Sequence, residues 1–409
     1  MLPEGWSLVE AKEVCKSISV GVVIKPTQYY VDESKGVKAF RSANVREGFI
    51  NDSDWVYFSQ EGHAANKKSH LKSGDVLVVR TGYPGTACVV TPDFEGANAI
   101  DIVIARPDVN QITPDYLCAY TNSHQGKSQV LDLQGGMAQK HLNVGAYQVL
   151  KIKLPPLPEQ KKIAKILSTW DKAITITEQL LANSQQQKKA LMQQLLTGKQ
   201  RLLDNNGVRF SGEWKDVEIG KVLKEVKRPV DWDDAADYKL LSVKRRSEGV
   251  VLREVLKGTE ILTKKMNIAQ SGDFLISKMQ IVHGAAGVVP DEFDGFHISD
   301  SYISLTPKDA RKLDIHFFAW FAKQKLMYHK AFLCSYGVHI EKMTFNFKLF
   351  LKEKISVPAS IEEQQKIAAV LSTADLEIAA LQQKLDAFKQ EKKALMQQLL
   401  TGKRRVKLN

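Results

Sequence analysis

The chain has 409 residues, of which 44% are hydrophobic, with 58 Lys and Arg against 46 Asp and Glu and a formal net charge of +12. This composition excludes wholesale disorder, and the length allows two or three domains with normal cores. The basic excess favours a polyanionic partner, because Lys and Arg release counterions when they bind phosphates, although a merely basic soluble protein would show the same excess.

The sequence shows no targeting or membrane segment. The N-terminus MLPEGWSLVE lacks the apolar core of a signal peptide, and no run reaches the roughly 18 to 20 apolar residues that cross a bilayer. The four cysteines lack C-x-x-C spacing, so they suit neither a zinc site nor a disulfide framework, and we expect them to be core residues. We therefore expect a reduced, cytoplasmic protein that is not associated with a membrane.

Residues 1–154 are predicted to form a first globular domain of mixed α and β structure. Apolar runs at 75–79, 86–91 and 99–105 are separated by Gly and Pro, which is typical of strands. The amphipathic stretch 114–123 is typical of a helix. This domain therefore combines short strands with at least one helix.

A long helix is predicted to follow over residues 155–201. Prolines at 155, 156 and 158 suit a helix entrance, and Gly198 suits a left-handed C-cap. Apolar residues recur at the 3.5-residue spacing of a coiled-coil seam, which Lys188 interrupts. The seam residues are Ile163, Leu167, Trp170, Ile174, Leu181, Leu191 and Leu195.

The second half of the chain repeats the first. The segment EQKKIAKILSTWDKAI at Glu159 recurs as EQQKIAAVLSTADLEI at Glu363, and KKALMQQLLTGK occurs at 188–199 and again at 392–403. Both matches have the same offset of 204 residues, which excludes shared composition bias as their cause. The repeat predicts a second mixed α/β domain over 202–357, with a helical stretch at 315–328, and a second helix with a basic tail over 358–409.

The second helix has a matching seam, which Lys392 interrupts. Its residues are Ile367, Leu371, Ala374, Ile378, Leu381, Leu385, Phe388, Leu395 and Leu399. Pairing the two helices would bury both seams, although each helix could instead pack on its own domain. A helix of about 39 residues is ~58 Å long and a 150-residue domain only ~40 Å across, so the second helix reaches the first most easily by running back antiparallel.

These predictions together give an α+β fold class. Two mixed α/β domains are separated by two long helices that form an antiparallel coiled coil, with a pseudo-twofold internal repeat. Weaker matches between the domains support the duplication. Ser73-Gly74-Asp75 corresponds to Ser271-Gly272-Asp273, and the segment 116–120 corresponds to 317–321.

Basic and amide residues gather in segments predicted to be loops or strand ends. Arg and Lys can pair with guanine there and Asn and Gln with adenine, or they can hold phosphates. The candidates for DNA contact are Arg41, Asn44, Arg46, Lys67, Arg80, Gln139 and Lys140 in the first domain, and Lys244, Arg245, Lys278, His339 and Lys342 in the second. Ordinary surface charge explains most of them as well. Arg41, Arg80, Lys140 and Lys278 are the strongest candidates.

No catalytic constellation stands out. Thr197-Gly198-Lys199 resembles the tail of a phosphate-binding loop, but Gln193 occupies the position of that loop's first glycine. The motifs G-x-G-x-x-G, H-E-x-x-H and G-x-S-x-G are absent, as is the Asn/Asp-Pro-Pro-aromatic tetrad of methyltransferases. Acids at 291–294 could suggest a nuclease cluster, but surface loop acids explain them better. We expect no catalytic residue, metal or cofactor.

The motif E-Q-x-x-I-A-x-x-L at the start of each helix and KKALMQQLLTGK at its end resemble the specificity subunit of Type I restriction-modification enzymes. The close match covers only the two helices, about a fifth of the chain, but both motifs occur twice. The resemblance implies a non-catalytic subunit whose two target-recognition domains each read one half of a bipartite, asymmetric DNA site.

The resemblance also implies partners. The two helices would act as a spacer, with half-sites roughly one duplex turn apart, and their surfaces would dock two methyltransferase subunits that restriction subunits join. Adenine methylation with S-adenosylmethionine and DNA cleavage would then belong to those subunits. Two rival hypotheses stay open: a coiled-coil scaffold that binds proteins and no DNA, and a self-sufficient DNA-modifying enzyme.

Overall fold

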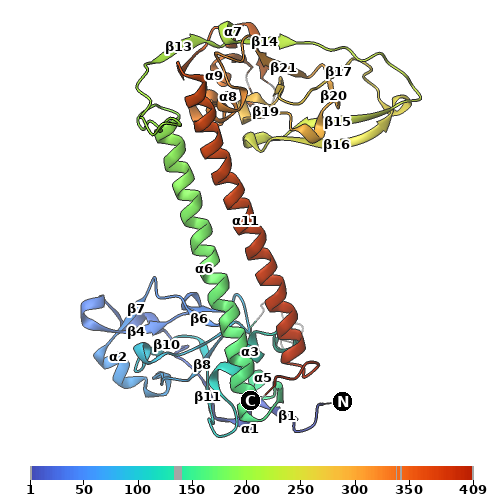
Figure 1. Cartoon of the computed structure of the whole chain (residues 1–409). Coiled ribbons are helices and arrows are strands. Elements are labelled where there is room, and N and C mark those ends of the chain that lie inside the picture. Colours follow the sequence, from blue (N-terminus) through green and yellow to red (C-terminus); the bar gives the residue numbers. More distant parts are fainter. Residues whose placement is uncertain (1, 133–140, 338, 341–342, 408–409) are drawn as a thin grey trace. The chain divides into compact units, whose positions relative to one another are not determined.

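The computed structural model describes residues 2–132, 141–337, 339–340 and 343–407. They form two compact units, the first of Met1–Leu180 with Leu381–Asn409 and the second of Leu181–Ala380 (Figure 1). Each unit contains one globular domain and a segment of each of two 39-residue helices, α6 (Leu157–Leu195) and α11 (Ile361–Leu399).

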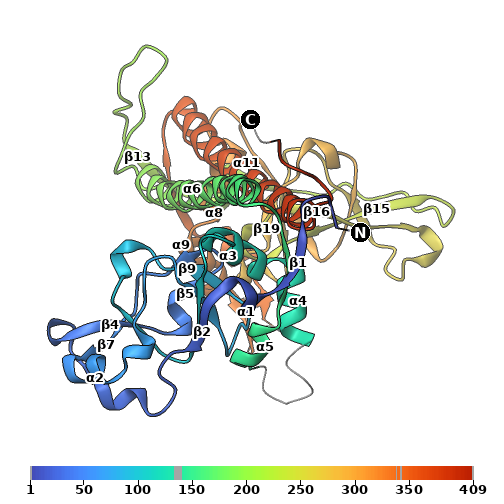
Figure 2. The same cartoon turned by 90° about the horizontal axis from the view of Figure 1, so that it is seen from below.

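The first domain combines short strands and helices (Figure 2). Its strands are β1 (Ser7–Glu10), β2 (Cys15–Val20), β3 (Tyr30–Val31), β4 (Gly36–Phe40), β5 (Val45–Arg46), β6 (Phe49–Ile50), β7 (Val56–Ser59), β8 (Val76–Val79), β9 (Ala87–Val89), β10 (Asn98–Ala99), β11 (Ile102–Pro107) and β12 (Lys151–Leu154). Its helices are α1 (Ala11–Val14), α2 (Gln60–Ala65), α3 (Pro114–Asn122), α4 (His124–Asp132) and α5 (Val144–Gln148). Two four-stranded sheets have the orders β2-β11-β8-β9 and β10-β4-β7-β3, and two smaller pairs are β1-β12 and β5-β6.

The second domain has the same kinds of element. Its strands are β13 (Trp214–Glu218), β14 (Leu223–Val226), β15 (Asp237–Val243), β16 (Val250–Lys257), β17 (Met266–Ile268), β18 (Phe274–Ser277), β19 (Ala286–Val288), β20 (His297–Ser299), β21 (Tyr302–Pro307), β22 (Ser335–Tyr336), β23 (Thr344–Phe345) and β24 (Lys354–Pro358). Its helices are α7 (Ile219–Val222), α8 (Ile315–Ala322), α9 (Lys325–Leu333) and α10 (Phe347–Phe350).

The topology confirms the predicted repeat of two mixed α/β domains. The antiparallel sheet β14-β21-β18-β19 has the strand order of β2-β11-β8-β9, and the pair β13-β24 corresponds to β1-β12. The remaining four-stranded sheets differ, because the second domain has the long hairpin β15-β16 in its sheet β16-β15-β20-β17. One sheet and its flanking strands are therefore common to both domains, while the other sheet has diverged.

The central strands of the shared sheet are buried on both faces. In β8, Val76 and Val78 join a cluster with α3 and the long helices, whereas Leu77 and Val79 join a cluster with Phe40. This explains why the strand is an unbroken apolar run instead of an alternating one. The main core of each domain thus lies between this sheet, its helices and segments of α6 and α11.

Two predicted elements are interrupted in the structure. The run 99–105 is divided between β10 and β11, which belong to different sheets, and Asp101 between them has a left-handed φ of 49°. The stretch 315–328 is divided into α8 and α9 at Lys323 and Gln324. The pattern of hydrophobic residues in the sequence does not predict either of these two breaks.

The two Ser-Gly-Asp motifs form equivalent turns with buried aspartates. Asp75 and Asp273 are each only 1% exposed. Arg106 donates to Asp75 at 2.7 Å, and Arg228 donates to Asp273 at 2.6 Å. Arg106 lies in β11, whereas Arg228 follows β14, so the two domains supply the cation from different strands.

Replacing Arg228 with alanine is expected to destabilise the second domain by about 3 kcal/mol, because removing one partner of a buried ion pair leaves an uncompensated charge. The exposed Arg311, which pairs with Asp309 on a surface turn, supplies the matched control, and Arg311→Ala should leave the unfolding midpoint unchanged. Chemical unfolding of both variants measures the difference. Equal midpoints for the two variants would contradict the assignment of Arg228 as a buried partner.

The helix-start motif makes the same contacts in both units. Glu159 and Glu363 are buried and accept bidentate hydrogen bonds from Arg405 and Arg201, respectively. Arg201 lies 42 residues after Glu159, and Arg405 lies 42 residues after Glu363. Each arginine therefore belongs to one repeat and pairs with the glutamate of the other repeat. The motif therefore joins each helix start to the basic segment that follows the end of the other helix.

The seam residues are buried partly by the domains and partly by the opposite helix. Ile163, Leu167 and Leu399 lie in the first core, with Leu395 packed on it, and Leu195, Ile367 and Leu371 lie in the second, with Leu191 packed on it. The Trp170 ring meets the Phe388 ring edge-on, with centroids 5.5 Å apart. Some seam residues therefore pack on a globular domain, and others contact the opposite helix.

The two lysines that interrupt the seams form ion pairs. Lys392 pairs with Asp171 in the first unit, and Lys188 pairs with Asp375 in the second. Both members of one pair lie 204 residues from their counterparts in the other. Glu178 also pairs with Lys389. From Asp171 to Glu178 the residue number on α6 increases, whereas from Lys392 to Lys389 the number of the paired residue on α11 decreases. The paired segments in the first unit thus run in opposite directions.

Candidate nucleic-acid interface

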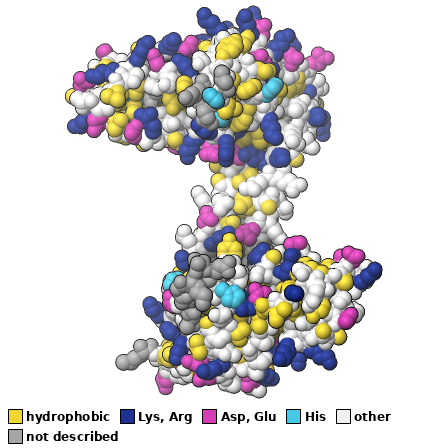
Figure 3. Space-filling model, turned by 180° about the vertical axis from the view of Figure 1, so that it is seen from behind, with side chains coloured by type: hydrophobic (Ala, Val, Ile, Leu, Met, Phe, Trp, Pro, Cys, Tyr) yellow, Lys and Arg dark blue, Asp and Glu magenta, His cyan; other side chains and the backbone are white. Residues whose placement is uncertain are grey.

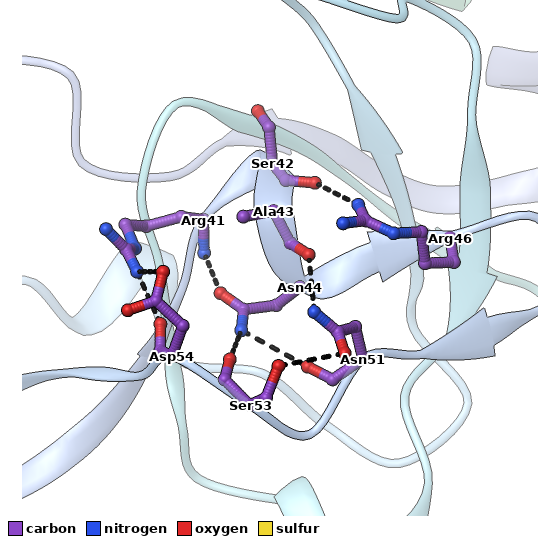
Figure 4. A network of polar contacts seen from close by, with 8 residues as sticks. All are labelled: Arg41, Ser42, Ala43, Asn44, Arg46, Asn51, Ser53 and Asp54. Carbon is purple, nitrogen blue, oxygen red and sulfur yellow. Dashed lines mark hydrogen bonds and ion pairs between the residues drawn. The ribbon is translucent and has the colours of Figure 1, made fainter. Parts of the chain in front are cut away.

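A polar loop follows strand β4 in the first domain and contains three of the candidates for DNA contact. The chain leaves β4 through a 3-10 turn, Ser42–Asn44, and then forms the β5-β6 hairpin. Asn44 is completely buried. Its side-chain oxygen accepts from the Arg41 backbone N–H at 2.9 Å, and its nitrogen donates to the carbonyls of Asn51 and Ser53 (Figure 4). The Asn44 amide is therefore fully used in holding the loop.

The two arginines of this loop lie closer to the surface. Arg41 donates to the carboxylate of Asp54 at 2.9 Å, and Asp54 itself has a left-handed φ of 54°. Arg46 is exposed, and its guanidinium donates to the carbonyl of Val45 at 3.1 Å (Figure 4 shows its contact with Ser42). Arg46 can release these weak surface contacts for a phosphate or a base edge more easily than Arg41 can leave its ion pair.

The loop borders a depression of about 560 Å³. Ser42 and Arg46 line one side, and Thr81, Gly82 and Tyr83 line the other. Tyr83 is 83% exposed, the largest aromatic exposure in the first domain's described part. An exposed aromatic side chain beside an arginine suits stacking on a base, and sequence reasoning missed Tyr83 because it considered only basic and amide residues.

The side chain of Arg80 is buried and holds neighbouring segments of the domain together. It is 8% exposed, and its guanidinium donates to the Leu142 carbonyl at 3.0 Å and to Asp101 at 2.5 Å. It also contacts the ring of His141. These contacts join the end of β8 to the segment that begins at His141. The neighbouring candidates Gln139 and Lys140 lie outside the described residues, whereas Lys67 is exposed on the turn Lys67–Ser69.

The second domain has a corresponding loop after β15. A 3-10 turn, Arg245–Ser247, precedes Glu248-Gly249, as the turn Ser42–Asn44 precedes Glu47-Gly48. Lys244, Arg245 and Arg246 are all exposed. Arg246 and Ser247 have left-handed φ values of 58° and 55°, which cost conformational energy in residues with a Cβ.

Contacts below the loop hold this strained conformation. The Ser247 backbone N–H donates to the Gly284 carbonyl at 2.9 Å, and the Ser247 hydroxyl lies 2.7 Å from the Tyr328 hydroxyl. Gly284 is required here, because a Cβ would come within 2.4 Å of the Tyr328 ring. The loop therefore presents three successive basic residues, Lys244, Arg245 and Arg246, from a fixed support.

The other candidates of the second domain are less uniform. Lys278 is half-buried and donates to the Asp300 carbonyl at 2.5 Å, so its ammonium has a partner within the domain. His339 is exposed, and Lys342 lies outside the described residues. On the face drawn in Figure 3, Lys and Arg side chains are scattered among Asp and Glu over each unit. Local charge density on this face therefore does not single out one loop.

The four cysteines lie in or near the domain cores. Cys88, Cys118 and Cys334 are buried and Cys15 is half-buried, as expected of core residues. Burial raises the pKa of the Cys88 thiol to about 12, so it stays protonated at neutral pH. Among the described residues, no group of three or more His, Cys, Asp or Glu could hold a metal ion.

The acids at 291–294 have a local structural role. Asp294 accepts from the Ser271 backbone N–H at 2.8 Å, and Asp291 accepts from the Ser271 hydroxyl. These contacts fix the turn before β18, as the surface-loop interpretation predicted. Within the described part of the chain, no helix is long and apolar enough to cross a membrane.

Comparison with known families identifies the repeated unit. A family model described as the Type I restriction modification DNA specificity domain matches the chain twice, over residues 3–183 and 211–390. The chain belongs to this specificity subunit family. Each match spans one domain and most of the long helix that follows it. The resemblance seen in the helix motifs is therefore confirmed over both halves.

Relatives of this specificity subunit match either nearly its whole length or about half of it. The putative Type I restriction enzyme MjaX specificity subunit of Methanocaldococcus jannaschii is 25% identical and covers 99% of this chain and 95% of its own. The EcoKI specificity subunit of Escherichia coli is 23% identical over 53% of this chain and 46% of its own.

Solved structures share the fold of this specificity subunit. The HsdS subunit from Thermoanaerobacter tengcongensis is 20% identical, covers 98% of each chain and has a TM-score of 0.51. The Type I S subunit from M. genitalium is 12% identical, covers 100% of this chain and 99% of its own, and has a TM-score of 0.60. At these identities the likeness establishes a common architecture.

Proposed function

We propose that each domain of this specificity subunit reads one half of a bipartite, asymmetric DNA site and that the chain itself performs no chemistry. In this proposal α6 and α11 form one antiparallel coiled coil, which sets the spacing between the half-sites. The coiled coil also docks two methyltransferase subunits, which restriction subunits join. Residues 1–154 and 202–357 are the readers, and 155–201 and 358–409 supply the spacer helices and tail.

The observation that supports this proposal best is the contrast between repeated and diverged contacts. The ion pairs Asp171–Lys392 and Lys188–Asp375 repeat with no change of residue type. The sheets that carry the two candidate loops differ in strand order and hairpin length. Two copies of one partner require equivalent docking surfaces, whereas an asymmetric DNA site requires two different readers.

Within each reader, burial separates the candidate residues into two roles. We propose that Arg41, Arg46, Lys67 and Tyr83 in the first domain reach DNA, as do Lys244, Arg245, Arg246 and His339 in the second. Asn44 and Arg80 shape the loops from below, because their polar groups are already bound within the domain. Lys278 acts through its contact with Asp300. Gln139, Lys140 and Lys342 stay candidates from sequence alone.

Selection from a pool of random duplexes tests the proposed function. The chain, mixed with its cognate methyltransferase subunit, should enrich duplexes that share two short specified segments separated by an unspecified gap. Enrichment of no motif would favour a protein scaffold over a DNA reader. Methylation or nicking by the purified chain alone would instead favour a self-sufficient enzyme, and we expect neither activity.

Arg46→Ala is expected to weaken binding to the selected site by about 1–3 kcal/mol and to relax its first-domain half alone, as loss of a base-contacting arginine does. Lys12→Ala is the matched control, since Lys12 is an exposed cation of the same domain that pairs with Glu10. Competition gel shifts with half-site variants measure both effects. Equal weakening on every duplex would show that Arg46 holds a phosphate and reads no base.

A further inference from the structure

The duplication allows each part of one unit to be compared with its counterpart in the other. Helices α3 and α8 begin in the same way, because the N–H of Thr113 and that of Asp314 donate to Gln160 and Gln364, respectively, both at 2.9 Å. The offset between these two helices is therefore 201 residues. It makes Trp320 of α8 the counterpart of Ala119 in α3.

In the second unit, the indole of Trp320 is enclosed by polar and cationic groups. Trp320 is only 5% exposed, and its N–H donates to the hydroxyl of Ser372 at 3.1 Å. The ammonium of Lys323 lies 3.9 Å from the ring centroid, and that of Lys188 lies 5.1 Å from it. Lys188 is also ion-paired with Asp375. The ring is thus held by a hydroxyl and two cation–π contacts.

In the first unit, the corresponding space is a cavity of about 430 Å³. Its wall includes Ala119 and the counterparts of three residues around Trp320, namely Ser168 for Ser372, Lys392 for Lys188 and Asp171 for Asp375. The counterpart of Lys323 is Asn122, which also lines the cavity. A cavity of about 150 Å³ suffices for a benzene ring, so this one can accept an indole. The first unit therefore retains the hydroxyl and one of the two cations that contact the ring, while the ring itself is absent.

The cavity continues into a wider groove of about 870 Å³ along α6 and α11. Phe49 and Ile176 line it and are 59% and 56% exposed. A single ring would leave this apolar rim uncovered, so a protein segment fits the groove better than a free small molecule does. The groove lies within the first unit alone, since every residue lining it belongs to that unit.

The charges on the rim indicate what flanks the aromatic residue. Three lysines of the groove already pair with acids, in the contacts Lys127–Glu47, Lys389–Glu178 and Lys392–Asp171. Lys172 and Lys393 also line the groove and are exposed, and the described residues give neither of them an ion pair. On the groove side, a carboxylate next to the inserted ring would therefore meet these two lysines, whereas Asp115 on the cavity wall would disfavour a carboxylate at the opposite side.

We propose that this cavity binds a tryptophan-sized aromatic side chain, flanked by an acidic residue, that a docked methyltransferase subunit presents. The identity of the partner rests on the proposed function. The two docking surfaces then differ. The first accepts the ring from the partner, whereas the second contains its own ring at Trp320.

A methyl NMR experiment on the complex tests the insertion directly. With the alanine methyls labelled, the Ala119 signal should move upfield when the cognate methyltransferase is added, because the methyl group would lie against an aromatic ring. A signal that does not move would overturn the proposal. A shift produced by N-acetyl-tryptophanamide but not by the methyltransferase would also overturn it, since the cavity would then be a small-molecule site.

Ala119→Trp tests the same point by filling the cavity from within. At one of the two docking surfaces it should weaken methyltransferase binding by on the order of tenfold to a hundredfold, the loss seen when an aromatic anchor is removed. Native mass spectrometry over a range of methyltransferase concentrations should then show that one of the two copies binds only at a tenfold to hundredfold higher concentration than it does with the original chain. Ala119→Ser, which adds no ring, should still bind two.

The outcomes separate this inference from the proposed function. Two copies bound with unchanged affinity by Ala119→Trp would overturn the inference and leave the proposed function intact. No methyltransferase bound by the unaltered chain would overturn both. Circular dichroism and the thermal midpoint verify that Ala119→Trp is folded, and if it is not, the NMR result on the unaltered chain decides.

Discussion

Replacing residues 205–358 with the same region of a related specificity subunit is expected to change one half of the methylated DNA site and leave the other half unaltered. The exchanged segment contains both β13 and β24, whose pairing closes the second domain. It leaves in place the ion pairs Arg201–Glu363 and Lys188–Asp375. The helices should therefore hold the new domain as they held the original one.

The reciprocal exchange of residues 1–154 provides the control for this result. It should alter the opposite half of the site, because each candidate loop belongs to its own domain. Sequencing of methylated adenines in cells that carry each hybrid and the methyltransferase measures both. If either exchange altered both halves together, the two domains would not be independent readers.

Inserting seven residues after Gln185 in α6 and seven after Lys389 in α11 is expected to widen the gap between the half-sites by about three base pairs. Seven residues make two helical turns and add about 10 Å, which keeps the 3.5-residue seam in phase. The two insertion points lie 204 residues apart and so occupy equivalent positions in the repeat. Both specified halves should stay the same, and the methylated motif reports the gap.

An insertion in α6 alone is the matched control. The insertion point lies between Asp171, which pairs with Lys392, and Lys188, which pairs with Asp375. Lengthening one helix makes it impossible to keep both pairs, so this variant should lose methylation or stability. An unchanged gap in the double insertion would contradict the role of the helices as a spacer.

The sequence predicted the long helices well because their signals are local and occur twice. Helix α6 ends at Leu195, close to the predicted end near Gly198, and α11 ends at Leu399. Each helix ends three residues before a glycine with a left-handed φ, Gly198 or Gly402. What the sequence did not reveal are the long-range partners. Asp75 finds its arginine in β11 and Asp273 finds its own after β14, and no spacing rule connects these positions.

The candidate DNA residues illustrate a different limit. Residue type and loop position selected Asn44 and Arg80 as readily as Arg46, yet burial separates them, because the first two are bound within the domain. Backbone conformation was also hidden, so the sequence did not show that Arg246 has a left-handed φ. The general location of the site could be predicted from sequence, whereas the role of each side chain depends on its surroundings.

Sequencing of methylated adenines in cells that contain this chain and its cognate methyltransferase is the most direct test of two-domain reading. We expect one asymmetric motif with two short specified segments, an unspecified gap between them and one methylated adenine in each segment, on opposite strands. A single uninterrupted motif, or a palindrome read identically at both ends, would contradict the proposal that two diverged domains each read one half of the site.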